Sequence, residues 1–105
     1  MSLSGKGRRR KGVRAEREVA ICFEKAGFPV RGLEGSGDHL VVCSPDLTLH
    51  VESKRQETLR LSDWTKQARA EAPQGTVAVV AYRKSREPWH VVLLLDDLVA
   101  LLPHA

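Results

Sequence analysis

The chain has 105 residues, 42% of them hydrophobic, which suits one domain with a single modest core. Its apolar runs are far too short to cross a bilayer and no signal peptide precedes them, so we expect no membrane partner and a cytoplasmic location. Cys22 and Cys43 are too few for a zinc or disulfide framework, so we interpret both as buried thiols.

The formal net charge of +4 is concentrated at the N-terminus. Residues 1–17 hold seven cations and one anion, a net +6, whereas the remaining 88 residues hold ten cations and twelve anions, a net −2. This asymmetry predicts binding to a polyanion. We favour nucleic acid over an anionic lipid surface or a merely solubilising tail, because the basic segment leads directly into a predicted helix that carries an acid.

The N-terminal third reads as an arm, a helix and a short strand. Residues 1–10 combine glycine, serine and four cations with almost no apolar side chain, which predicts a flexible basic arm. A helical apolar stripe starts near Gly12, and Gly27 is a natural stop for that helix. A short strand is expected at 28–32, followed by a loop at 33–37.

Two hairpins are expected further along the chain. The β-rich runs 40–43 and 47–54 are separated by turn residues, which predicts the first hairpin. The runs 76–82 and 89–95 are separated by a polar segment with a proline, which predicts the second.

Two more helices complete the expected fold. One is predicted at 62–72 with Ser62 as its N-cap, and a last short one at 96–102 with Asp96 as its cap. The predicted order is α-β-β-β-α-β-β-α, in one α/β domain that spans residues 11–105.

The strand at 47–54 carries the most informative residues. Side chains alternate along a strand, so Glu52 and Lys54 emerge on one face, together with His50. The hairpin should fold Asp38, fourteen positions upstream, back toward Glu52, and Glu16 lies on the flank of the first helix's apolar stripe. Two carboxylates beside a lysine can hold a hard divalent cation and position a water. Taken alone, Glu-x-Lys is more typical of a solvated ion pair, and a lone histidine there of a packing or phosphate-contacting residue.

The full pattern resembles the PD-(D/E)xK nuclease superfamily and, within it, the archaeal-type Holliday junction resolvases and their virus-encoded relatives. The resemblance runs from about Lys11 to Trp89. The segments that carry it are Lys11-Gly12-x-x-Ala15-Glu16-Arg17-Glu18, Gly27-Phe28-x-Val30-Arg31, Gly35-Ser36 and Glu52-x-Lys54. It implies a restriction-endonuclease-like core with a mixed central sheet flanked by helices. It also implies a homodimer that uses Mg²⁺ and acts on branched DNA, in a prokaryotic cell or a virus-infected host cell. Because Mn²⁺ also favours oxygen ligands, we expect it as a substitute for Mg²⁺.

The resemblance also assigns roles residue by residue. The catalytic set it implies is Glu16, Asp38, Glu52 and Lys54, of which Asp38, Glu52 and Glu16 would hold metal; no organic cofactor is implied. The DNA-binding set, which combines the matched positions with the basic arm, is Arg8, Arg9, Arg10, Lys11, Arg14, Arg17, Arg31 and Ser36.

One departure from the superfamily pattern affects the choice of acid. The Pro-Asp dipeptide stands here at Pro45-Asp46, only six residues before Glu52. Asp46 would then lie at the hairpin tip, about 20 Å from Glu52 along an extended strand, too far to share a cation. We therefore assign the metal-binding role to Asp38.

These observations favour a metal-dependent endonuclease that resolves four-way DNA junctions by paired phosphodiester hydrolysis, with the family's 5′-phosphate and 3′-hydroxyl products. The first alternative is another PD-(D/E)xK nuclease, of restriction, repair or general viral type. A less favoured alternative is a non-catalytic basic DNA-binding protein. The two-fold symmetry of a junction predicts a dimer, with an interface formed by the apolar segments Trp89–Leu95 and Leu98–Leu102.

Overall fold

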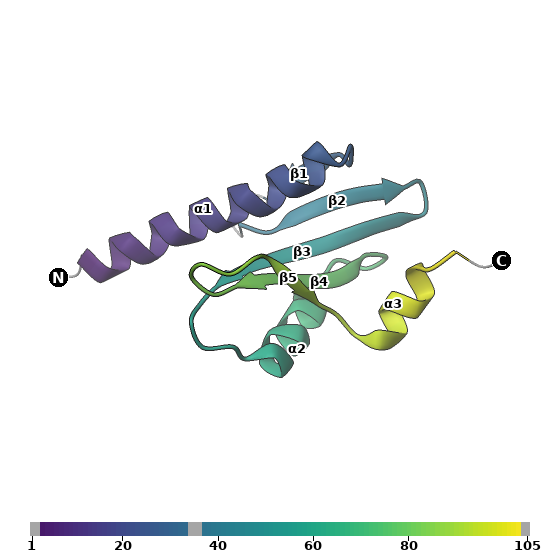
Figure 1. Ribbon diagram of the computed structural model, residues 1–105. Helices are drawn as coiled ribbons and strands as arrows, with labels where there is room; N and C mark the ends of the chain where they lie inside the picture. The colour runs from purple at the N-terminus through teal and green to yellow at the C-terminus, as the bar shows by residue number, and fades with distance from the viewer. Residues whose placement is uncertain (1–2, 34–36, 104–105) are drawn as a thin grey trace.

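The computed structural model describes residues 3–33 and 37–103, with the backbone alone for residues 3–11. The order of elements is the predicted one (Figure 1). The elements are α1 (Leu3–Lys25), β1 (Val30–Gly32), β2 (His39–Ser44), β3 (Leu47–Arg55), α2 (Leu61–Glu71), β4 (Val77–Arg83), β5 (His90–Val92) and α3 (Leu95–Leu101).

The five strands form one mixed sheet in the order β1-β2-β3-β4-β5. Strands β3 and β4 are parallel and are connected by α2, whereas the other neighbouring pairs are antiparallel. Both predicted hairpins are therefore present, as β2–β3 and β4–β5. Strand β3 lies in the centre of the sheet, with a hydrogen-bonded neighbour on each side.

Helices α1 and α2 cover opposite faces of the sheet (Figure 1). On the first face, Val19 of α1 packs against a core that includes Leu49 and Val51 of β3. On the second face, Trp64 and Ala68 of α2 pack against buried residues of β4. The apolar cover from α2 thus lies over β4, and the α2-facing side of β3 carries polar residues instead.

Helix α1 begins earlier than the sequence indicated. We expected a flexible arm over residues 1–10 and a helix from Gly12, but the helix begins at Leu3. Arginine and lysine are strong helix formers, and extending a formed helix adds a hydrogen bond for each residue without a new nucleation step. The N-terminal part of α1 consequently extends past the end of the sheet (Figure 1). The division into residues 1–10 and 11–105 stays a prediction.

The starts of the two later helices also differ from expectation. Ser62 was expected to cap α2, but the helix begins at Leu61, with Arg60 at the cap position and no side-chain cap bond. Leu61 packs on the Trp64 cluster, which draws it into the helix. Helix α3 begins at Leu95, so Asp96 is not its cap. It is an acid in the first turn, where its negative charge interacts favourably with the positive end of the helix dipole.

The prediction of two buried thiols was wrong for Cys22. Both cysteines are free, but Cys22 is exposed and only Cys43 is partly covered. The row of α1 that faces the sheet runs through Ala15, Val19 and Phe23, and Cys22 lies beyond the edge of that row.

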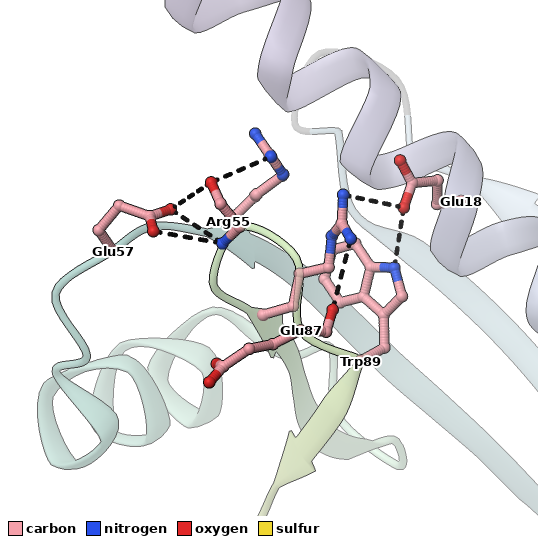
Figure 2. Close-up of polar contacts among 7 residues, drawn as sticks. Glu18, Arg55, Glu57, Glu87 and Trp89 are labelled. Atoms are coloured by element: carbon pink, nitrogen blue, oxygen red, sulfur yellow. Dashed lines mark hydrogen bonds and ion pairs between the residues drawn. The ribbon is translucent and has the colours of Figure 1, made fainter.

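A group of three side chains fastens α1 to the β4–β5 hairpin (Figure 2). Trp89 donates its Nε1–H to Glu18 Oε1 at 3.0 Å, and an Arg83 guanidinium nitrogen lies 3.6 Å from the same oxygen. The Arg83 guanidinium also stacks over the Trp89 ring, 5.5 Å from its centroid. We call Glu18, Arg83 and Trp89 the Glu18 clamp. Because consecutive helical residues are about 100° apart, the clamp directs Glu16 to the other side of α1.

Exposed apolar side chains gather at the C-terminal end. They are Val91, Leu95, Leu98, Val99 and Leu102, with exposed fractions from 40% to 71%. In the described part of the chain, no helix combines the length and the hydrophobicity that crossing a membrane requires. This apolar surface coincides with the segments that the sequence assigned to a dimer interface.

Candidate active site

The antiparallel β2–β3 ladder brings the two predicted metal-binding acids together. Leu40 of β2 pairs with His50 of β3. The same register, continued by two residues, sets Asp38 opposite Glu52, where side chains on one face are about 5 Å apart. The hairpin therefore places Asp38 beside Glu52, as the sequence predicted.

Two of the polar residues on this face of β3 are buried. His50 is 2% exposed and Glu52 is 4% exposed, whereas Lys54 is only partly covered. They line a cavity of about 480 Å³ between the sheet and the C-terminal end of α2. The described residues around that cavity are Leu33, Asp38, His50, Glu52, Lys54, Gln67 and Glu71.

Three carboxylates converge in this cavity. Asp38, Glu52 and Glu71 each offer an oxygen, and these atoms all lie within 4.8 Å of one another. Glu71 was missed by the sequence analysis. A signal existed, because Trp64, Ala68 and Glu71 follow the i, i+4, i+7 spacing of one helix face, and that face packs on the sheet.

His50 is in contact with Asp38. Its Nε2 lies 3.2 Å from Asp38 Oδ2, while its buried Nδ1 has no hydrogen-bond partner among the described residues. An imidazole in this position fixes the direction of the Asp38 carboxylate, much as outer-shell groups do around metal ligands. The packing interpretation of His50 fits its burial, and the phosphate-contacting one does not.

Glu16 reaches the site from the opposite side. A Cβ atom built on Gly37 would lie 2.8 Å from the Glu16 Cδ, so the end of the Glu16 side chain lies close against the backbone before β2 and would have to shift if residue 37 carried a side chain. Gly37 also has a φ of 79°, in the left-handed region that glycine tolerates. Glu16 is therefore next to Asp38 but does not belong to the three-carboxylate group among the described residues.

Comparison with known proteins gives a match among solved structures. No protein-family model matches the chain, and no curated protein matches it either. Among solved structures, Hjc, a Holliday junction resolvase from the archaeon Archaeoglobus fulgidus, superposes with a TM-score of 0.56 and 26% sequence identity. The match covers 77% of this chain and 70% of that one. The chain has the fold of an archaeal-type Holliday junction resolvase.

The resolvase fold confirms the expected fold class, a restriction-endonuclease-like α/β core with a mixed five-stranded sheet. The choice of Asp38 over Asp46 agrees with the geometry of that core. Asp46 is exposed at the tip of the β2–β3 hairpin, where its N–H donates to Ser44 Oγ at 3.2 Å. The Pro45-Asp46 dipeptide thus forms the turn and lies at the far end of β2 from Asp38.

In the absence of metal, burial and neighbouring charges shift the pKa values of the acids at this site. Burial, a hydrogen bond with Glu71 and the charge of Asp38 together raise the pKa of Glu52 to about 8, although Lys54 opposes them. Burial raises the pKa of Asp38, with His50 opposing, and burial and Asp38 raise that of Glu16. The hydrogen bond to Glu52 lowers the pKa of Glu71. Of this pair, Glu52 therefore keeps its proton to the higher pH and Glu71 ionises first.

The predicted DNA-binding residues are only partly described. Arg14 and Arg17 are exposed on α1, and Arg31 is exposed on the edge strand β1. The side chains of Arg8, Arg9, Arg10 and Lys11 lie outside the described part, although their backbone is helical, and Ser36 lies outside it altogether. The DNA-binding role of the whole set stays a prediction.

The raised pKa of Glu52 predicts an unusual pH dependence of stability without metal. The unfolded chain ionises this group near 4.5, whereas the folded chain keeps its proton to about 8. Between these values the folded state binds more protons, so stability falls as pH rises, and the dependence ends above pH 8. Asp38 and Glu71 add repulsion, and Lys54 reduces it.

Glu52→Gln should therefore melt at a higher temperature than the wild type in EDTA at pH 8, by about 4–8 °C for each ~1 kcal/mol of relieved burial cost. The difference should shrink toward pH 4. Thermal melts across this range measure it, with Asp46→Asn as a control that follows the wild type. Parallel curves for Glu52→Gln and wild type would contradict the assignment.

Proposed function

We propose that the protein is a metal-dependent endonuclease that resolves four-way DNA junctions by making a pair of cuts in each junction. The observation that carries this proposal is the group of three carboxylates around the buried Glu52, on the fold of a junction resolvase. Burying a carboxylate without a charge partner is costly, so a strand that buries one beside two more acids serves chemistry better than stability.

The donor atoms fit a hard divalent cation. All three acids offer oxygen, the ligand that Mg²⁺ and Mn²⁺ prefer. The buried Glu52 Oε2 has no hydrogen-bond partner among the described residues, which is the state expected of a ligand atom. Asp38 and Glu52 would hold Mg²⁺, with Mn²⁺ as a substitute. When bound, the cation would neutralise phosphate charge and promote ionisation of a water.

The chain's own residues would arrange the rest of the reaction. A water oxygen forms a bond to phosphorus and the bond from phosphorus to the 3′ oxygen breaks, which leaves a 5′-phosphate and a 3′-hydroxyl. Lys54, on the open side of the same strand face, would orient the attacking water or stabilise the extra negative charge on the phosphate. Glu16 would align water from the α1 side, and His50 would keep Asp38 in place.

Helix α1 offers a surface for the phosphate backbone. It has 23 residues and is therefore about 35 Å long, and its N-terminal part extends beyond the sheet (Figure 1). The seven cations of residues 1–17 all lie on it. We propose that the predicted DNA-binding residues contact DNA; they are Arg8, Arg9, Arg10, Lys11, Arg14, Arg17, Arg31 and Ser36.

The substrate's symmetry favours a homodimer. Resolving a junction requires cuts in two opposed strands, and one chain offers one site, so two copies related by a two-fold axis are the simplest solution. The exposed apolar surface of β5 and α3 is the proposed interface, because a small monomer would otherwise leave it in water.

A nuclease of the same fold with another DNA substrate is the second candidate function. The 26% identity to the resolvase favours this candidate, because such an identity supports the shared fold better than a shared substrate.

The first prediction of this proposal separates catalysis from binding. Asp38→Asn and Glu52→Gln should each lower cleavage of a mobile junction in Mg²⁺ by about 100-fold or more, since even outer-shell changes at metal sites cost 10–100-fold. Affinity for the junction, measured in Ca²⁺ or EDTA by gel shift, should stay within a few-fold because the basic helix is intact.

Asp46→Asn is the matched control, with the same chemical change at the other end of the hairpin, and should cleave normally. Full activity in Asp38→Asn, or loss in Asp46→Asn alone, would remove the site as described. Equal cleavage of a junction and of a linear duplex of the same length would favour the second candidate function.

The second prediction concerns the basic helix. Arg8→Ala/Arg9→Ala/Arg10→Ala keeps good helix formers but removes three cations, so DNA affinity should fall and the slope of log K against log salt should flatten by up to about 0.9 for each lost phosphate contact. Gel-shift titrations at several salt concentrations measure this slope. Lys25→Ala, at the other end of α1, is the control, and an unchanged slope in the triple variant would exclude a DNA role for the segment.

The third prediction concerns assembly. Sedimentation at micromolar concentration should give about twice the 11.7 kDa of one chain. Leu95→Glu/Val99→Glu should give monomers, because buried charges would oppose the apolar contact, whereas Val42→Glu on the exposed face of β2 should stay dimeric. Mixing wild type with Glu52→Gln should give singly nicked junctions. Complete resolution by a monomeric protein would exclude the paired mechanism.

A further inference from the structure

Glu71 is a surface residue that points into the site. It is the last residue of α2 and its side chain is exposed, so it has room to turn toward solvent. Its carboxylate nevertheless lies within 4.8 Å of the ligand atoms of both Asp38 and Glu52. An exposed acid that approaches two other acids is held there by specific contacts.

Two contacts hold the Glu71 carboxylate in this direction. Gln67, one helical turn earlier, donates its Nε2–H to Glu71 Oε1 at 3.1 Å. Glu71 also shares a hydrogen bond with Glu52 across the cavity. The first contact comes from its own helix and the second from the sheet, so Glu71 connects the two layers at the cavity.

The charge balance of this position is unfavourable without a cation. The C-terminal end of a helix carries partial negative charge, which disfavours an acid in the last turn. Three carboxylates face the cavity, and of the described residues that line it only Lys54 carries a fixed positive charge. A divalent cation between the three oxygens would remove the repulsion and would be favoured by the helix end as well.

A separate observation indicates that the cavity receives a ligand. The Glu52 side chain is 4% exposed, and its Oε2 has no hydrogen-bond partner among the described residues. Buried carboxylate oxygens are almost always partnered, so this atom is suited to a partner that is not part of the chain. Glu16, by contrast, approaches Asp38 from α1 and does not join the three oxygens.

We propose that Glu71 is a third direct ligand of the divalent cation, supplied by the crossover helix, and that Glu16 does not share that ion. This inference rests on the proposed metal-dependent function and extends it. Asp38 and Glu52 are fixed by the strands, whereas Glu71 lies at the exposed end of a helix. The bound ion would therefore connect α2 to the sheet at the cavity. The site would bind it more tightly because of Glu71, a ligand that is not part of the PD-(D/E)xK sequence pattern.

Metal binding without DNA tests the inference. The probe is Mn²⁺ alone, titrated by calorimetry into the full chain, at 0.05 M and at 1 M KCl. Glu71→Gln should weaken Mn²⁺ affinity about 10-fold or more, since outer-shell groups alone cost 10–100-fold, and the loss should persist at 1 M KCl, where the screening length is about 3 Å. Asp63→Asn, the same charge change in the first turn of α2, should leave the affinity within 2-fold, and Glu16→Gln should lose less than Glu71→Gln.

The outcomes distinguish this inference from the function on which it rests. If Asp38→Asn loses Mn²⁺ and Glu71→Gln binds like Asp63→Asn, Glu71 is not a ligand and the proposed function stands. A loss in Glu71→Gln that disappears at 1 M KCl would also overturn the inference, because it would then be a field effect. If the wild type itself takes up no Mn²⁺, the inference and the metal centre both fall. Circular dichroism confirms that each variant is folded.

Discussion

The burial of the Glu52 carboxylate is the constraint on which the rest of this structure depends. Strand β3 lies in the middle of the sheet with a hydrogen-bonded neighbour on each side, and the alternation of side chains places an acid where a core residue would normally lie. The α1 face of the strand keeps an apolar core. The apolar cover from α2 lies over β4, which leaves a cavity in front of Glu52 where other charged groups can approach it.

Much of the fold, and the Asp38, Glu52 and Lys54 part of the site, could be predicted because they depend on local sequence patterns. Strand alternation determines that Glu52 and Lys54 share a face, and a short turn determines that the β2–β3 hairpin returns Asp38 to Glu52. Turn chemistry also distinguishes Asp46 from Asp38, since the Pro45-Asp46 dipeptide forms the turn itself. The element order followed from the same local signals, and the resemblance supplied the function that these signals alone leave open.

What could not be predicted depends on how distant elements pack. The helix-face spacing indicates that Glu71 faces the sheet, but it joins the acids only because the crossover helix ends beside β3, which that spacing does not state. The contact of His50 with Asp38 requires the register and the burial together. The cap position of α2 differs from expectation because Leu61 packs on the Trp64 cluster and extends the helix, against the preference of serine. Helix α3 also begins earlier than expected, but its first residue Leu95 is exposed, so packing does not account for that start. The helical start at Leu3 likewise reflects propagation from an anchored helix.

The close approach of Glu16 to Gly37 has a consequence for how relatives of this chain could be recognised. A profile that weighs residues by their chemistry would treat the position before the first strand acid as loop filler. Here the missing side chain leaves room for the end of the Glu16 side chain, which would have to move if a Cβ atom were present, and the positive φ of Gly37 is a second reason for glycine at this position. A search that requires glycine immediately before that acid, together with a glutamate on the first helix, would therefore separate chains with this geometry from those that share only the Glu-x-Lys strand.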